Sequence, residues 1–249
     1  MAERIARGER AVVAASVFLL AGLAWTWTMT GAGLASGDGM AGMGAAAPPG
    51  FLVVLAMWWV MMAAMMLPSA APAILLYGRV RSAHRDDPAI AGSWIFMAGY
   101  LLAWLAIALA ATGLQSMATR AGLLDAATMR VTSRWLTGAT LLAAGLFQLS
   151  PLKHACLAKC RSPAAFLTRH WQAGAAGALR LGLLHGLYCV GCCWLLMALL
   201  FVGGVMNLLW IAALAALVAV ERLVGWGAAI GKVAGFGLIL WGIGRLAGL

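Results

Sequence analysis

Cysteine and histidine side chains with metal-ligand spacing occur in one apolar stretch of this sequence. The stretch HGLYCVGCCW, residues 185–194, places His185, Cys189, Cys192 and Cys193 within about 100° of arc if the segment is an α-helix. Thiolate and imidazole bind soft and borderline metal ions, and sulfur ligands select Cu(I) over hard cations. The spacing therefore predicts a metal site on one face of a helix.

A second sulfur-rich stretch, MWWVMMAAMMLP, occupies residues 57–68 and contains five methionines. Met61, Met62 and Met65 share one side of a helix, and thioethers bind soft metal ions without losing a proton. Pro68 removes one backbone hydrogen bond, so we expect a kink that lets this helix adjust around an ion. Packing between helices is the alternative interpretation of the methionines. If the two stretches touch, their sulfur atoms should lie together near the membrane midplane.

The remaining cysteines lie four residues apart in PLKHACLAKC, residues 151–160. One helical turn would bring Cys156 and Cys160 together, and His154 could join them if the backbone after Pro151 is irregular. We interpret them as a second thiol site at the inner end of a membrane span, with unligated, reduced cysteines as the alternative. No cysteine falls on the expected outer side, which excludes a secreted disulfide framework.

The composition indicates that these segments are membrane helices. The chain has 249 residues, of which 64% are hydrophobic and 10% charged, and its mean hydropathy is +0.96. A soluble domain is about 45–50% apolar. We expect an all-α, polytopic transmembrane helix bundle, because a span must satisfy its own backbone hydrogen bonds. Seven apolar runs lie near the length of about 20 residues that crosses a bilayer: residues 11–28, 51–77, 91–115, 134–150, 178–204, 206–221 and 228–246.

The distribution of basic residues predicts the orientation of these spans. With a cytoplasmic N-terminus, thirteen of the 17 lysines and arginines fall on the inner side and four on the outer side. We therefore expect a multi-pass protein of the cell inner membrane, with residues 1–249 forming one integral membrane domain whose first span is retained. The net charge of +10 reports topology in this setting and does not indicate nucleic-acid binding.

The sulfur atoms are also distributed unevenly between the two sides. Apart from Met1 and Met97, the methionines lie at or outside the expected midplane, and the cysteines lie at or inside it. Thioether suits an oxidising exterior, and thiolate is the stronger ligand toward the cytoplasm. This gradient favours inward acquisition of copper. Glu221, at the end of the sixth run, is either an interfacial charge or a candidate for proton or ion handling.

Four blocks of the sequence resemble a known family. They are MWWVMMAAMMLPSAAP, FQLSPLKHACLAKCRSP, GLYCVGCCWLLMALLFVGGVMNLLW and the later ER, and they are similar to domain-of-unknown-function family 2182. That family is described as predicted metal-binding integral membrane proteins. The resemblance covers about residues 50–225, with mild departures at Phe147 and Arg222, where the family usually has Tyr and Lys. It implies a metal-binding membrane protein, whereas the choice of copper rests on the ligand chemistry.

Taken together, these features favour a metal-binding membrane protein that handles Cu(I), by transport or by delivery to a metallochaperone or cuproprotein. Zn remains open as the metal. A membrane thiol–disulfide electron carrier using the C-x-x-C pair Cys189 and Cys192 is one alternative, and a structural or assembly protein is another. The acids are few, and no Ser-His-Asp order or phosphate loop is present, so an enzyme is not favoured.

Overall fold

The computed structural model describes residues 2–30, 50–83, 89–125 and 128–248, and the fold is all-helical, as the composition predicts. Each of the seven apolar runs is largely helical, and the fifth is divided between a long helix and a short one. Two short helices follow the fourth run. In chain order the helices are α1 (Ala2–Met29), α2 (Phe51–Ala83), α3 (Ala89–Arg120), α4 (Arg134–Leu149), α5 (Pro151–Arg161), α6 (Pro163–His170), α7 (Gly174–Ala198), α8 (Leu200–Gly203), α9 (Leu208–Leu223) and α10 (Gly227–Ala247).

Several of these helices have the length and composition of membrane spans. Among the described residues, α1, α2, α3, the α7–α8 segment and α10 are each long and apolar enough to cross a membrane, and the bent pair α4–α5 is a sixth candidate. The α9 helix has 16 residues, roughly 24 Å at 1.5 Å per residue, which is shorter than a typical bilayer core. The structure thus supports a multi-pass membrane protein with five to six spans, and the seventh span remains a prediction.

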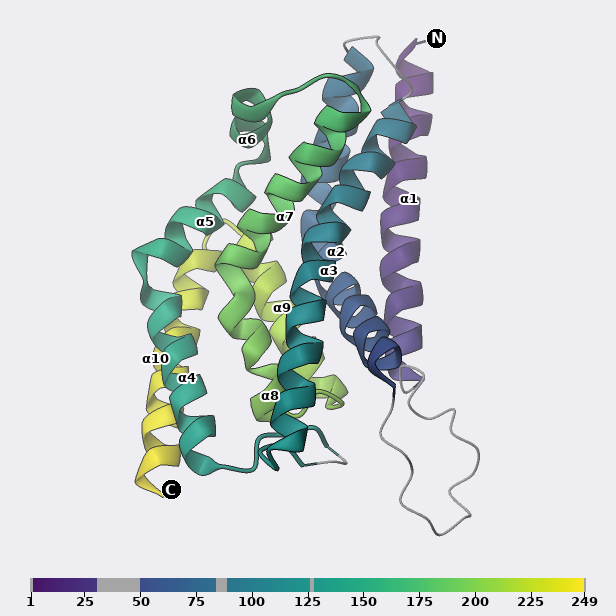
Figure 1. Cartoon of the computed structure of the whole chain (residues 1–249). Coiled ribbons are helices and arrows are strands. Elements are labelled where there is room, and N and C mark those ends of the chain that lie inside the picture. Colours follow the sequence, from purple (N-terminus) through teal and green to yellow (C-terminus); the bar gives the residue numbers. More distant parts are fainter. Residues whose placement is uncertain (1, 31–49, 84–88, 126–127, 249) are drawn as a thin grey trace.

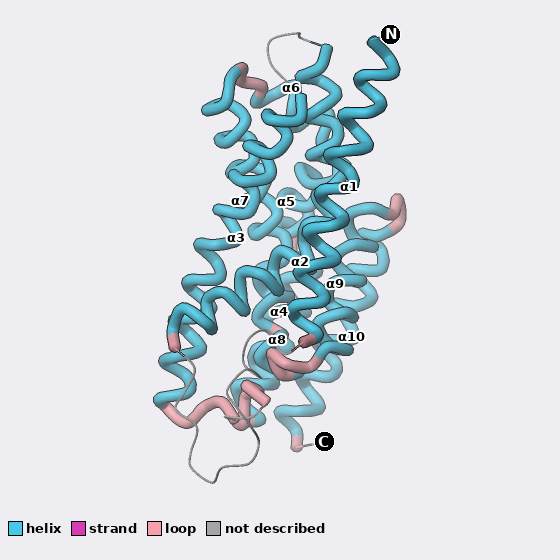
Figure 2. The backbone as a smooth tube through the Cα atoms, turned by 90° about the vertical axis from the view of Figure 1, so that its right-hand side faces the viewer, coloured by secondary structure: helices cyan, strands magenta, loops and turns pink. Residues whose placement is uncertain are grey.

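The helices form one elongated bundle with the two chain ends at opposite ends of it (Figure 1). The α3 helix packs along α7, α4 packs along α10, and α2 packs between α1 and α3. Figure 2 shows the same bundle from the side, with the turn between α9 and α10 partway along its length rather than at an end. Three basic residues that the sequence assigns to the inner side, Arg81, Lys153 and Arg222, are buried in the protein.

The close packing of α3 on α7 depends on a glycine. A Cβ atom on Gly182 of α7 would overlap the carbonyl oxygen of Phe96 on α3. Small residues let membrane helices approach closely, and the helix that approaches α7 here is α3. This contact fixes the face of α7 that turns into the protein.

The α2 helix continues through Pro68, and its two halves run in visibly different directions (Figure 1). Proline has no N–H to donate to the carbonyl four residues earlier, which is that of Ala64. The indole Nε1–H of Trp25, on α1, donates to this oxygen at 3.1 Å. The freed carbonyl is therefore satisfied by protein, as a membrane interior requires.

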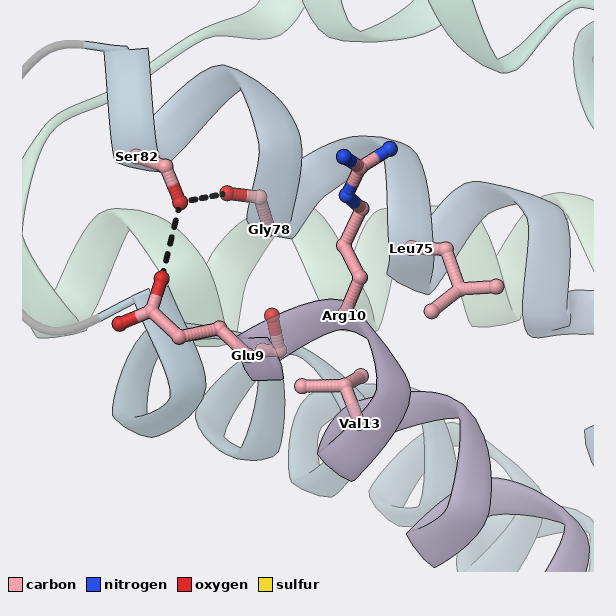
Figure 3. Close-up of a pocket in the computed structure, with 7 residues that line it drawn as sticks. Glu9, Arg10, Val13, Leu75, Gly78 and Ser82 are labelled. Carbon is pink, nitrogen blue, oxygen red and sulfur yellow. Dashed lines mark hydrogen bonds between the residues drawn. The ribbon is translucent and has the colours of Figure 1, made fainter. Parts of the chain in front are cut away.

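The N-terminal part of α1 and the C-terminal part of α2 also meet through polar side chains (Figure 3). The Ser82 hydroxyl is 3.3 Å from a carboxylate oxygen of Glu9 and 3.0 Å from the carbonyl oxygen of Gly78. These residues line a small pocket between α1, α2 and α3. None of the residues that line this pocket contains sulfur. They are Glu9, Arg10, Val13, Leu75, Gly78, Ser82 and Ser93.

A sharp bend of 62° separates α4 from α5. Pro151 cannot continue α4, and the Ser150 hydroxyl accepts a hydrogen bond from the Lys153 amide at 3.2 Å, which starts α5 as a new helix. Beyond the bend α5 lies against α7, where a Cβ atom on Gly191 would be 3.1 Å from the Cys156 sulfur. The bend therefore brings the α5 cysteines to the cysteine-rich part of α7.

Candidate metal centre

The three cysteines of α7 lie in the interior of the bundle. Cys189, Cys192 and Cys193 are 0%, 2% and 1% exposed. The thiols of Cys192 and Cys193 donate hydrogen bonds to the Cys189 carbonyl oxygen at 3.1 and 3.0 Å, so both side chains lean back toward the preceding turn. This leaves their sulfur atoms side by side on the inner face of α7.

His185 is buried one turn before Cys189. Its ring lies between the rings of Phe96, Tyr100 and Phe166, with centroid distances of 6.0, 6.0 and 5.4 Å. The Nδ1 atom has no hydrogen-bond partner within the described part of the chain. An imidazole nitrogen without a partner in an aromatic pocket is available as a ligand or as a relay position.

The most informative residue of the site is one that sequence reasoning treated as an inner-side charge and as a mild departure from the family pattern. Arg222 of α9 is 7% exposed, and its Nη2 is 3.1 Å from the Cys192 sulfur and 3.6 Å from the Cys193 sulfur. Nη2 also donates to the Cys189 carbonyl at 3.0 Å, and Nη1 donates to the Ser69 hydroxyl of α2 at 3.0 Å. A guanidinium group is thus held directly on the two thiols.

A second residue that the sequence does not reveal is Tyr100 of α3. Its hydroxyl oxygen is 2.9 Å from the Cys189 sulfur and 3.3 Å from the Met66 carbonyl oxygen of α2. The hydroxyl is buried, and it joins the proline-containing α2 to the cysteines of α7. No spacing rule could have selected this tyrosine, because it stands alone in an apolar run.

The α5 helix adds a fourth thiol to the same cluster. The thiol of Cys160 lies close enough to that of Cys192 to interact with it, and Cys156 lies against the α7 backbone at Gly191. The pair predicted as a separate inner site therefore adjoins the α7 cysteines. His154, on the same helix, is partly buried, and its Nε2 has no hydrogen-bond partner among the described residues.

The methionines of α2 are buried, and their connection to the cysteines is indirect. Met61, Met62 and Met65 are each 1–2% exposed. The helices that pack most closely on α2 are α1, α3 and α9, and the bridges from α2 to the cysteines of α7 run through Tyr100 and Arg222. A direct approach of methionine and cysteine sulfur atoms stays a prediction.

Glu221 belongs to a buried polar group and is not an interfacial charge. It is 2% exposed, its Oε2 lies 2.6 Å from the Lys153 ammonium of α5, and its Oε1 accepts from the Gln148 amide of α4 at 2.7 Å. Lys153 also donates to the Gln148 oxygen. The carboxylate therefore ties α5 and the end of α4 to α9, immediately beside Arg222.

The sulfur atoms are hydrogen-bonded in this structure and are not spread around a central space. Within the described ranges, no group of three or more histidine, cysteine, aspartate and glutamate side chains is arranged to hold a metal ion. Two thiols on one guanidinium nitrogen are nevertheless present. A pair of thiolates is a soft donor set, which suits Cu(I) and fits poorly with the four ligands of a structural zinc site.

Comparison with known proteins bears on this cluster. A family model described as PpoB2, copper chaperone, matches residues 55–244. The chain belongs to this copper chaperone family. The matched region contains every cysteine, Tyr100, Arg222 and the polar group around Glu221, and it overlaps the blocks that resemble family 2182. No similar protein of curated function and no similar solved structure was found. Membership of a copper chaperone family fits a copper-related membrane protein, and the thiol cluster lies inside the matched region.

Proposed function

We propose that this protein binds Cu(I) inside the membrane at the cysteine cluster and delivers it to a copper protein. The observation that carries the proposal is that the buried sulfur atoms of Cys192 and Cys193 share one hydrogen-bond donor, Arg222. The chain that contains this contact belongs to the copper chaperone family. Soft sulfur ligands, exclusion of water and membership of this family all support the same cargo.

The cluster offers a sequence of donors for an ion moving through the bundle. The buried thioethers of Met61 and Met65 in α2 would take Cu(I) first, since they need no deprotonation. Cys192 and Cys193 of α7 would hold it next as thiolates, because a thiol loses its proton when it ligates a metal. We assign the N-terminus to the cytoplasm and the protein to the inner membrane, as the basic residues predict.

The α5 helix is the element best placed to pass the ion on. Cys160 already contacts Cys192, and Cys156 lies beside it on the same helix. Transfer between adjacent thiols avoids releasing free Cu(I) into the lipid. Delivery through α5 is thus favoured over simple passage across the membrane.

A thiol–disulfide carrier is the second candidate, and one contact favours it. The thiols of Cys160 and Cys192 interact across α5 and α7, so this pair is a candidate for disulfide formation in addition to Cys189 and Cys192. The hydrogen bonds of Cys192 and Cys193 to a cation are equally the arrangement expected of metal-binding thiolates.

Anaerobic loading of the purified protein with Cu(I), followed by elemental analysis, tests the main proposal. Replacing Cys192 and Cys193 by serine keeps acceptors for Arg222 and substitutes hard oxygen donors for soft sulfur, so bound copper should fall to near zero. Met117→Leu is the control, because it removes a sulfur atom that is 69% exposed on α3, away from the buried cluster, and it should leave the bound amount close to that of the parent. Helical content and monodisperse elution should be unchanged in both. Equal copper in the double variant would refute the site.

A further inference from the structure

The charge on Arg222 is held among neutral and sulfur groups. Its described hydrogen bonds go to the Ser69 hydroxyl, the Cys189 carbonyl and the sulfur atoms of Cys192 and Cys193, and none of them goes to a carboxylate. The adjacent acid, Glu221, is already paired with Lys153. An arginine without a carboxylate partner in an apolar interior is costly unless another anion balances it.

We propose that Arg222 makes the cysteine site selective for monovalent soft ions by balancing the charge of a bis-thiolate complex. The inference rests on the proposed function. A monovalent ion on two thiolates leaves one negative charge, which the guanidinium cancels. A divalent soft ion on the same two thiolates is neutral, and it leaves the guanidinium charge unbalanced inside the protein.

The electrostatic interaction between the guanidinium and the bis-thiolate complex should be strong, because the contacts are short and shielded from water. Nη2 lies 3.1 Å from one sulfur and 3.6 Å from the other, and all the groups involved are less than 9% exposed. Charges at such separations interact strongly where water cannot screen them. Other charges near the site do not cancel this one, because the Lys153–Glu221 pair is internally neutral and Tyr100 and Ser69 are uncharged hydroxyl groups.

Ag(I) and Hg(II) isolate charge from geometry, since both are soft and both favour two thiolates in a line. The measured quantity is the ratio of their affinities for the purified protein, obtained by competition with a thiol chelator of known affinity. Arg222→Met should lower the Ag(I)-to-Hg(II) affinity ratio by about tenfold or more, the equivalent of about 1.4 kcal/mol. Arg222→Lys keeps the charge and should retain most of the parent's preference.

A second pair of variants leaves the arginine and all cysteines in place. Ser69→Asp would set a carboxylate beside Nη1, where the hydroxyl now lies at 3.0 Å, and so neutralise the guanidinium. Ser69→Asn introduces a side chain of nearly the same size as aspartate but without its charge, and it is the matched control. The aspartate variant should shift the ratio in the same direction as Arg222→Met, and the asparagine variant should not.

The outcomes separate this inference from the proposal on which it rests. If the parent binds neither Ag(I) nor Hg(II) through Cys192 and Cys193, the proposed function is wrong. If the parent binds both ions and neither Arg222→Met nor Ser69→Asp changes the ratio relative to its control, the site stands and charge selection is overturned.

Discussion

Replacing Lys153 by methionine tests whether the buried polar group holds α5 in place. The substitution keeps most of the apolar stem and removes the ammonium that lies 2.6 Å from Glu221. The carboxylate would retain its hydrogen bond from Gln148 but lose its only ion-pair partner among the described residues. Removing one partner of a buried pair typically costs about 3–5 kcal/mol.

The double variant Lys153→Met with Glu221→Met gives the matched comparison. With both charges gone the unpaired carboxylate no longer exists. The remaining cost is that of the Gln148 amide, whose oxygen loses the Lys153 donor, while its nitrogen loses the Glu221 acceptor and keeps the Gly231 carbonyl at 3.4 Å. Leaving one such buried polar group unpaired costs about 1–3 kcal/mol. The double variant should therefore be more stable than Lys153→Met alone, although it removes more of the native contacts.

Denaturation of the purified protein in micelles, followed by circular dichroism, measures both effects. A linked readout is the rate of oxidative cross-linking between Cys160 and Cys192, which should fall in Lys153→Met because α5 is no longer fixed beside α7. Stability of Lys153→Met within about 0.5 kcal/mol of the parent, the range of ordinary surface changes, would show that the pair does not fasten α5.

Two further substitutions test the packing that positions the site. Gly182→Val should separate α3 from α7, because even a Cβ atom there overlaps the Phe96 carbonyl, and should lower both thermal stability and copper binding; Gly113→Ala on α3, where nothing lies within 4 Å, should change neither. Trp25→Phe removes the donor to the Ala64 carbonyl, and it should destabilise the protein by about 1–3 kcal/mol in a denaturation experiment, the cost of one unsatisfied buried group. An unchanged midpoint for Trp25→Phe would mean that this carbonyl finds another donor.

The helices could be predicted because their signal is local. Runs of apolar residues of about the length of a membrane span indicate where helices form. The position of Pro68 likewise predicts an altered helix, although the sequence does not show that Trp25, 39 residues away from Ala64, supplies the missing donor. Such a partner is set by the packing of α1 on α2.

Arg222 shows why the site could only be predicted in part. A charge at the end of an apolar run is typical of a membrane margin, and the sequence places it there. In the structure the turn after α9 lies partway along the bundle, and Arg161 of α5 covers it by donating to the carbonyls of Val224 and Gly225 at 2.9 and 2.6 Å (Figure 1). The burial of Arg222 therefore depends on the bend before α5, which no pattern around residue 222 reports.

Glu221 and Arg222 are consecutive residues with opposite charges, and they face different helices. One is held by Lys153 of α5 and the other by the thiols of α7. Because both are part of the last turn of α9, that helix cannot rotate about its axis without straining the two contacts together. A rotation that frees the thiols from the guanidinium would also break the ion pair that holds α5. The position of α9 therefore couples the cysteines proposed to bind the ion to the helix proposed to pass it on.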